Sequence, residues 1–427
     1  MTFVEVNVVN TEFASGQGFY KLDPMPFSFE VLATSGAARR GRITTAHGVI
    51  ETPVFMPVGT LASIKGVPQH LLEELGVEIL LGNTYHLYLR PGCDLIRSMG
   101  GLHRFMAWPR PILTDSGGFQ VYSLSPFRKV SEEGVAFQSH IDGSRHFFTP
   151  EKSMDAQIAL GADMIMAFDE CTEYPATRQR VESSLQQTLR WARRSQQHYQ
   201  QHRQETVWRS SSFSVPLIDA PAYSRAEAGP GPDQDFFPAL FGIVQGGMHP
   251  DLRREASRQM VEMNFPGYAL GGLSVGEPRE LRADIVAGAL EHLPPEKPRY
   301  VMGVGYPEEI VSYALLGVDM MDCVLPTRAA RHGLLFTSEG RINIKNARFA
   351  ADPGPLDPAC ACRVCGRYSR AYLRHLYVTG EALAGVLNTV HNLAYYLDTM
   401  RRVRQSINAA NPSGDIPKAV SAEIPRR

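Results

Sequence analysis

Eight short apolar runs, spread over most of the chain, constrain its fold more than any other feature of the sequence. Each run ends at, or just before, a Gly, Asp or Gln residue. Apolar runs of this length are typical of strands buried on both faces, as in parallel sheets. The eight runs are residues 53–58, 78–82, 111–115, 163–169, 240–245, 268–272, 300–303 and 318–322.

Stretches with helical character lie between several of these runs. Thr149, Pro150 and Glu151 resemble a helix start, with an N-cap residue, a first-turn proline and a first-turn acid. Strands that alternate with helices in this way predict an α/β protein with a (β/α)8 TIM barrel over residues 29–340. An open, doubly wound sheet is the alternative, but no Gly-rich phosphate-binding turn follows the first run. The helical stretches are residues 67–75, 150–160, 178–197, 251–263 and 280–293.

Four segments lie outside this alternation. Residues 1–28 precede the barrel and are interpreted as an N-terminal arm. Residues 195–238 are rich in Gln, Ser, Pro and Arg without periodicity, which predicts an insertion loop. Residues 341–407 are expected to form a C-terminal subdomain with closing helices, and residues 408–427 a flexible tail.

Composition excludes several classes of protein. Hydrophobic residues make up 44% of the 427-residue chain and charged residues 20%, which allows a large core. No run reaches the roughly 18 apolar residues of a membrane helix, and the N-terminus lacks the pattern of a secretory signal. Six cysteines are too few for a disulfide scaffold. We therefore predict a cytoplasmic protein without a membrane partner.

Charge is unevenly distributed, although the net charge is only −1. Residues 328–427 carry 15 Lys and Arg against 7 Asp and Glu, whereas the first 327 residues carry 28 against 37. A basic C-terminal quarter predicts a polyanionic partner at one end of the molecule. A solvated basic surface is the alternative interpretation.

Three cysteines, Cys360, Cys362 and Cys365, lie within six residues of one another. Structural zinc takes four sulfur or nitrogen ligands, and closely spaced cysteines in tight loops supply them. His375, His391 and Cys323 are candidates for the fourth ligand, and His391 is favoured because it can face back across a helical hairpin. No acidic residues cluster nearby, so one closed structural Zn²⁺ site is predicted, with free thiols as the alternative.

Polar residues at the ends of the predicted strands are the candidates for chemistry, because active groups of such barrels lie at the C-terminal strand ends. Carboxylates, an amide and bare backbone together suit recognition of a flat heterocycle. The residues at these positions are Asp115, Asp169, Gln245, Gly272 and Asp322.

Asp322 stands out because Met, Cys, Val and Leu surround it in the sequence. A carboxylate in such a context is costly unless it has partners or a chemical role. Two carboxylates at a sugar centre, one attacking and one moving the proton, are the elements of two-step glycosyl transfer. A structural aspartate paired with Arg328 is the alternative.

Seven motifs, in order from about Phe27 to Ile407, resemble those of the bacterial tRNA-guanine transglycosylases. They are Thr114-Asp-Ser-Gly-Gly-Phe-Gln120, Phe168-Asp-Glu-Cys171, Gly242-Ile-Val-Gln-Gly-Gly247, Gly271-Gly-Leu-Ser-Val-Gly-Glu277, Gly303-Val-Gly305, Asp319-Met-Met-Asp-Cys-Val-Leu-Pro-Thr-Arg328, and the three cysteines with the later His391. The resemblance implies a TIM barrel with a zinc subdomain.

The same resemblance implies roles for individual residues. Asp322 corresponds to the nucleophile that attacks the target ribose, and Asp115 to the general acid and base. Phe119 and Met302 correspond to the two faces that sandwich the base. The implied substrate-binding residues are Ser116, Gly117, Gly118, Phe119, Asp169, Cys171, Gln245, Gly271, Gly272, Leu273 and Met302. The implied RNA-binding residues are Gly303, Val304, Gly305, Tyr306, Pro307, Glu308, Glu309, Thr327, Arg328, Ala329, Ala330 and Arg331.

The activity that the resemblance implies is exchange of the wobble guanine of GUN-anticodon tRNAs for a 7-deazaguanine base, a step of queuosine biosynthesis. Cys171 and Val275 match the bacterial pattern, which implies the 7-aminomethyl base, with queuine as the alternative. The partners implied are the tRNA anticodon loop and a second copy of the chain in a homodimer.

Two further functions compete with this interpretation. A non-catalytic tRNA-binding partner subunit would keep the barrel and the zinc, but it has no need of Asp115, Asp169, Gln245 and Asp322 together. A retaining glycosidase acting on free sugars could use the same pair of carboxylates, yet it leaves the basic C-terminal region unexplained.

Overall fold

Eight parallel strands close into a barrel, as the apolar runs predict. The computed structural model describes residues 27–124, 127–205 and 236–409. The last strand pairs with the first, so that the barrel has no open edge, and an open doubly wound sheet is excluded. Its strands are β4 (Val54–Gly59), β5 (Leu80–Gly82), β6 (Ile112–Thr114), β10 (Met164–Met166), β11 (Ala239–Val244), β12 (Gly267–Leu270), β13 (Arg299–Val301) and β14 (Met320–Cys323).

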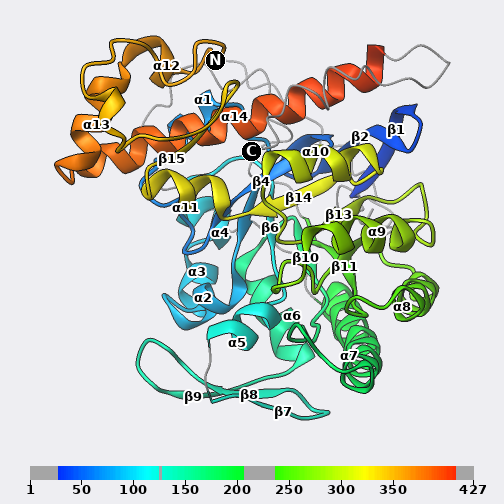
Figure 1. Ribbon diagram of the computed structural model, residues 1–427. Helices are drawn as coiled ribbons and strands as arrows, with labels where there is room; N and C mark the ends of the chain where they lie inside the picture. The colour runs from blue at the N-terminus through cyan, green and yellow to red at the C-terminus, as the bar shows by residue number, and fades with distance from the viewer. Residues whose placement is uncertain (1–26, 125–126, 206–235, 410–427) are drawn as a thin grey trace, which may run out of the picture.

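Helices follow the strands around the outside of the barrel (Figure 1). Helix α6 begins at the predicted cap, where the Thr149 hydroxyl accepts a hydrogen bond from the Lys152 amide at 3.2 Å. No helix of the described residues is both long and apolar enough to cross a membrane. The helices up to the last strand are α1 (Gln69–Glu74), α2 (Thr84–Leu89), α3 (Cys93–Ser98), α4 (Gly101–Phe105), α5 (Gly118–Leu124), α6 (Pro150–Leu160), α7 (Arg178–Glu205), α8 (Pro250–Glu262), α9 (Arg279–Leu290) and α10 (Pro307–Leu315).

Helix α7 corrects the predicted start of the insertion. The insertion was expected from residue 195, but α7 continues to Glu205. Two residues in this polar part of α7 form hydrogen bonds to other elements. Ser195 is fully buried and its hydroxyl accepts from the Phe168 amide at 3.2 Å, and the Tyr199 hydroxyl donates to the Pro238 carbonyl at 2.7 Å. Residues 206–235 of the predicted insertion lie outside the described residues.

A three-stranded antiparallel sheet that the sequence pattern did not indicate closes the N-terminal end of the barrel. It consists of β1 (Ser28–Ser35), β2 (Ala38–Thr45) and β3 (Gly48–Thr52). Ile43 and Ile50 are fully buried and pack with barrel residues such as Val54 and Met320, which lie at the first positions of their strands. The opposite, C-terminal end of the barrel is therefore the end available for chemistry. The predicted arm lies outside the described residues as far as residue 26.

A second small sheet lies between β6 and α6. It is antiparallel and consists of β7 (Lys129–Val130), β8 (Val135–Gln138) and β9 (Arg145–Phe148). Beyond the barrel come α11 (Leu325–Arg331), the hairpin β15 (Leu334–Thr337) and β16 (Gly340–Asn343), the 3-10 helix η2 (Ala347–Phe349), α12 (Arg363–Arg367), α13 (Arg370–Val378) and α14 (Ala382–Ala409). Helix α14 includes the first two residues of the predicted tail and ends at Ala409, and residues 410–427 lie outside the described residues.

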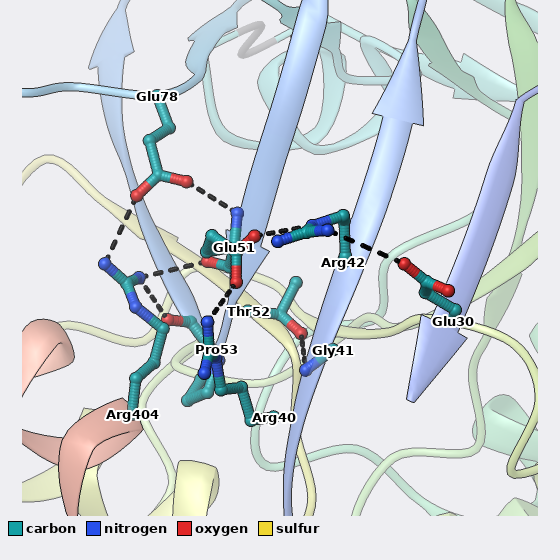
Figure 2. A network of polar contacts seen from close by, with 9 residues as sticks. All are labelled: Glu30, Arg40, Gly41, Arg42, Glu51, Thr52, Pro53, Glu78 and Arg404. Carbon is teal, nitrogen blue, oxygen red and sulfur yellow. Dashed lines mark hydrogen bonds and ion pairs between the residues drawn. The ribbon is translucent and has the colours of Figure 1, made fainter. Parts of the chain in front are cut away.

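Helix α14 returns to the start of the barrel and lies against β1, β2 and β4 (Figure 1). Its Arg404 guanidinium donates to the carbonyls of Glu51 and Pro53 at 3.0 and 2.9 Å, and to the Glu78 carboxylate at 3.2 Å (Figure 2). Glu78 in turn accepts from the Glu51 amide at 2.6 Å. Arg404 thus ties the last described helix to the chain just before the first barrel strand.

Candidate functional site

Three carboxylates, two of them buried and that of Asp322 partly buried, lie at the C-terminal ends of barrel strands. Asp115 directly follows β6, Asp322 is the third residue of β14, and Asp169 lies three residues after β10. Asp115 and Asp169 are each only 7% exposed. The hydrogen bonds to these three side chains, described next, all come from neutral groups. The C-terminal end of the strands is where TIM barrels carry their active sites.

Asp115 is held by neutral donors on both oxygens. Asn83 and Gln120 donate their side-chain amides to Oδ2 at 2.6 and 2.8 Å, and the Thr84 amide donates to Oδ1 at 2.8 Å. Burial raises the pKa of Asp115 to about 6, although these donors act in the opposite direction. A carboxyl group that titrates near neutral pH can both give and take a proton.

Asp322 is bound through one oxygen. The Tyr300 hydroxyl and the Gly303 amide both donate to Oδ1, at 2.5 and 2.9 Å. Burial raises the pKa of Asp322, and the two donors oppose that effect by stabilising the carboxylate. These two bonds fix the orientation of the side chain and leave Oδ2 available, which is the arrangement that a carboxylate nucleophile requires.

Asp115 and Asp322 lie in one electrostatic environment. The charge of Asp322 contributes to the raised pKa of Asp115. The pKa of Tyr300 lies well above its ordinary value. Burial is the largest cause, and the charges of Asp322 and, to a smaller extent, Asp115 raise this pKa further. Two acids with separate hydrogen-bond partners but a shared field are able to take different roles at one reacting centre.

Asp169 belongs to a second group of polar side chains. Ser116 donates its hydroxyl to Oδ1 and Gln245 its amide to Oδ2, both at 2.7 Å. Burial raises the pKa of Asp169 as well. The structure therefore brings together Ser116, Asp169 and Gln245 from three different strand ends, and their donors and acceptors suit the edge of a planar heterocycle.

Glycines allow the backbone to approach this group closely. A Cβ atom at Gly118 would lie 2.6 Å from the Asp169 carbonyl oxygen, and one at Gly271 would lie 2.8 Å from Nε2 of Gln245. At Gly272, where φ is +64°, a Cβ would overlap the Gln245 side-chain oxygen. Any side chain at these three positions would displace the amide or the carboxylate, so glycine is required there.

The remaining base-contact candidates differ in exposure. Phe119 is 47% exposed and Met302 is partly buried, so the phenyl ring and the methionine side chain both keep some exposed surface. Cys171 and Leu273 are buried, at 4% and 6% exposure, and form part of the wall rather than the surface. Gly117 adopts a positive φ of 82°, which glycine adopts without strain.

The residues predicted to contact RNA fall into two classes. Arg328 and Gly303 are exposed, and Arg331 and Tyr306 are partly buried. Burial and the neighbouring charge of Arg328 lower the pKa of Arg331. The side chains of Val304, Pro307, Thr327, Ala329 and Ala330 are buried, so at these positions only the backbone or the shape of the surface is available to a ligand.

Glu308 and Glu309, also predicted to contact RNA, are engaged in ion pairs. Glu309 forms an ion pair with Arg282 at 2.7 Å, and Glu308 pairs with Arg341. The guanidinium groups of Arg279 and Arg341 lie over the Tyr306 ring, at 3.7 and 4.5 Å from its centroid. This cluster fixes the start of α10 next to Gly303 and leaves the side chains of Arg279 and Arg341, but not the buried Arg282, partly exposed.

Three cysteines and one histidine converge in the C-terminal region. The ligand atoms of Cys360, Cys362, Cys365 and His391 all lie within 4.8 Å of one another. The His391 Nδ1 atom lies 3.7 and 3.3 Å from the sulfur atoms of Cys362 and Cys365. Its Nε2 atom lies 2.8 Å from the Phe336 carbonyl, which accepts the Nε2 proton and leaves Nδ1 free for a metal. The cluster could therefore bind a metal ion.

Comparison with known proteins agrees with this geometry. A profile of the family described as queuine tRNA-ribosyltransferase matches residues 34–414. The chain belongs to the queuine tRNA-ribosyltransferase family. A protein of that name from Koribacter versatilis (strain Ellin345) is 64% identical over 400 residues, which cover 94% of this chain and 99% of the relative. Another, from Solibacter usitatus (strain Ellin6076), is 54% identical over 383 residues, 89% of this chain and 94% of the relative.

Membership in the queuine tRNA-ribosyltransferase family confirms the family predicted from the seven motifs. It also confirms the predicted class of enzyme, a glycosyl-transferring enzyme that exchanges a base in tRNA. A non-catalytic tRNA-binding partner subunit and a glycosidase acting on free sugars are thereby set aside.

Four residues of the site were missed by sequence reasoning. Asn83 and Thr84 follow β5, so the strand-end rule could have found them; Gln120 falls within a quoted motif but received no role. Tyr300 lies inside β13, where its hydroxyl reaches Asp322 from within the barrel. No local pattern distinguishes it from the other buried aromatic residues of the core.

Proposed function

We propose that this enzyme exchanges the wobble guanine of GUN-anticodon tRNAs for 7-aminomethyl-7-deazaguanine through a covalent aspartyl-ribose intermediate. The observation that carries the proposal is the convergence of Asp115 and Asp322 in one electrostatic environment, with different hydrogen-bond partners. One acid is bound so that an oxygen stays available, and the other has a pKa of about 6.

In the first step, Oδ2 of Asp322 attacks C1′ of the target ribose while the bond from C1′ to the guanine nitrogen breaks. Asp115 supplies the proton that the departing guanine needs. The hydrogen bonds from Tyr300 and Gly303 hold Asp322 in one orientation throughout. Holding the reacting groups in place in advance reduces the entropy cost of the attack.

In the second step, the incoming base takes the place of guanine. Asp115, now a carboxylate, removes a proton from the incoming ring nitrogen, which then attacks C1′ and releases Asp322. A pKa of about 6 keeps both forms of Asp115 accessible at neutral pH, as this alternation requires.

Asp169, Gln245 and the backbone at Gly272 would bind the edge of the base. Without a base, Asp169 and Gln245 satisfy one another at 2.7 Å, so their bonding capacity is preserved until a ligand replaces that contact. Phe119 and Met302 retain the exposed surface needed to cover the two faces of the ring. Flipping the guanine out of an anticodon loop costs only a few kcal/mol.

Arg328 and Arg331 are the proposed phosphate contacts, because both lie in the basic C-terminal quarter and Arg328 is exposed. The resemblance also supports a homodimer, and sedimentation of the purified protein would test it. For the Cys360, Cys362, Cys365 and His391 cluster we propose one structural zinc ion, because three thiolates and one imidazole complete a closed tetrahedral set.

A guanine-exchange assay tests the proposed reaction. Labelled guanine should enter a tRNA with a GUN anticodon and not a tRNA whose wobble base is changed. Asp322→Ala should bind tRNA but form no denaturant-resistant adduct. An adduct that persists in Asp322→Ala would overturn the assigned nucleophile.

The identity of the inserted base needs a separate experiment. Cys171 and Val275 support the smaller aminomethyl base, because they match the bacterial pattern, and that resemblance implies less room than queuine's cyclopentenediol needs. The purified enzyme should incorporate labelled 7-aminomethyl-7-deazaguanine faster than labelled queuine. Faster incorporation of queuine would leave the reaction intact and change only its substrate.

A further inference from the structure

A second cluster of metal-binding side chains lies on the outside of the barrel, between α6 and α7. It consists of Asp155 on α6 and of His198 and His202 on α7, and their ligand atoms all lie within 4.8 Å of one another. The two helices pack side by side (Figure 1). The cluster contains no residue of the site at the barrel end and none of the four residues of the cysteine cluster.

The geometry of the cluster is that of three ligands around one point. Oδ1 of Asp155 lies 2.7 Å from Nε2 of His198 and 3.0 Å from Nε2 of His202, and the two Nε2 atoms are 3.1 Å apart. Ligand atoms about 2.1 Å from one ion, at octahedral or tetrahedral angles, are themselves about 3.0–3.4 Å apart. The three observed separations are equal to or slightly shorter than these values, so a small outward movement of the ligand atoms would make room for an ion among them.

No arrangement of protons on the two imidazoles makes all three of these contacts hydrogen bonds. A carboxylate oxygen accepts, so both imidazoles must carry a proton on Nε2 to bond with Asp155. The two N–H groups then point at each other across 3.1 Å. If one Nε2 loses its proton, the histidine pair is satisfied, but that nitrogen and the Asp155 oxygen oppose each other with lone pairs. A cation at the centre satisfies all three atoms at once.

The helix places the two histidines in register. His198 and His202 are four residues apart, so their side chains lie on the same face of α7, and histidines at this spacing form metal sites on helices. One turn earlier, Arg194 of α7 binds Glu151 of α6 through two bonds of 2.8 Å. The ion would thus continue a ladder of contacts that already joins the two helices.

We propose that Asp155, His198 and His202 form a binding site for a divalent transition-metal cation of the zinc and nickel class. Two imidazole nitrogens and one carboxylate oxygen suit these ions better than calcium or magnesium, which prefer oxygen ligands only. The side chains are 52%, 23% and 30% exposed, so an ion reaches them from solution and water completes its coordination. Its effect is to fasten the last turns of α7 to α6.

Nickel is a suitable probe, because it binds imidazole and is distinguishable from resident zinc. Protein that carries one equivalent of zinc should be titrated with NiCl2 by calorimetry, while elemental analysis shows that the zinc is retained. The full chain should bind one equivalent of Ni²⁺, and its thermal midpoint should rise with Ni²⁺ concentration. His198→Gln and His202→Gln should each weaken Ni²⁺ binding by about tenfold or more.

His70→Gln is the matched control, because His70 is an exposed histidine on α1 outside the cluster. It should bind Ni²⁺ like the unaltered protein, and all three variants should keep their base-exchange activity. Equal Ni²⁺ affinity in His198→Gln, His202→Gln and His70→Gln would show adventitious surface binding and overturn the proposal. So would the absence of any bound nickel in the full chain.

Discussion

The two ends of the barrel both bury aspartates, but they neutralise them in opposite ways. At the N-terminal end, Asp319 and Asp163 directly precede β14 and β10. Asp319 is fully buried and pairs with the Arg39 guanidinium through both oxygens, while Asp163 contacts His47 and His103 at 2.8 and 3.1 Å. Each carboxylate has a basic partner on an element that closes the barrel.

At the C-terminal end, Asp115, Asp169 and Asp322 have only amide, hydroxyl and backbone donors among the bonds described above. Burial raises the pKa of each of the three. At the other end the imidazoles keep the pKa of Asp163 well below its ordinary value, whereas burial raises the pKa of Asp319 although Arg39 acts in the opposite direction. Removing one member of a buried ion pair leaves an uncompensated charge and destabilises the fold, whereas carboxyl groups with perturbed pKa values and neutral partners are candidates for chemistry.

The largest expected effect is that substitutions at the two ends of β14 change different properties, the exchange rate at one end and the stability of the fold at the other. Asp322→Asn should lower the exchange rate by about 10⁴-fold or more, because the nucleophile is lost, and leave the thermal midpoint nearly unchanged. Asp319→Asn should destabilise the fold by about 3–5 kcal/mol, because Arg39 is left unpaired. Exchange rates and chemical denaturation of both variants measure this. Strong destabilisation by Asp322→Asn together with a stable Asp319→Asn would contradict the division.

A smaller effect is expected at Tyr300, which bonds to the nucleophile from inside the barrel. A hydrogen bond to a charged group contributes about 1.5–3 kcal/mol. Tyr300→Phe should therefore lower kcat by about tenfold to a hundredfold and leave the tRNA dissociation constant unchanged. Tyr268→Phe is the control, because this buried tyrosine of the neighbouring strand contacts the Val261 carbonyl instead. Equal loss of kcat in both variants would point to packing.

The pH dependence of exchange should change when a donor to Asp115 is removed. The rate should show a break near pH 6, where Asp115 titrates. Asn83 stabilises the ionised form by donating to Oδ2, so Asn83→Ala should move the break to higher pH, by up to about one unit. A break that stays in place in Asn83→Ala would assign it to another group.

The smallest effect is on the slope of stability against pH, at most about 1.4 kcal/mol per pH unit for each group. Asp163 has a lowered pKa, so its stabilisation is complete above about pH 4 and is lost below it. Asp115 has a pKa raised to about 6, so the folded state binds the extra proton and stability falls as pH rises from about 4 to 6.

Denaturation curves measured across this range separate the two groups. Asp163→Asn should make the acid-side loss smaller, and Asp115→Asn should make the fall between about pH 4 and 6 smaller, each by the contribution of the carboxylate that is removed. Unchanged slopes in either variant would mean that the carboxylate does not titrate as described.

Sequence alone predicted the barrel because each strand is a short apolar run whose periodicity is local. The closing sheet β1–β3 was missed because its partly exposed strands carry no comparable run, and their burial depends on contact with distant barrel residues such as Met320. The start of the insertion was misplaced because Ser195 and Tyr199 are anchored by residues on other elements.

The site was predictable to the extent that it follows strand ends. This rule found Asp115, Asp169, Gln245 and Asp322. Asn83 also lies at a strand end, but it was not predicted. The requirement for glycine at Gly271 and Gly272 was not derivable from the sequence, because it arises from the position of the Gln245 side chain after folding.

Arg404 and the pairing of β14 with β4 have a consequence for biosynthesis. Strand β4 is made early, yet its partner on one side is made about 260 residues later and its anchor Arg404 later still. A ribosome must deliver nearly the whole polypeptide before the first strand has all its neighbours. Until then the nascent chain exposes an unpaired strand edge, which is the kind of surface that promotes aggregation.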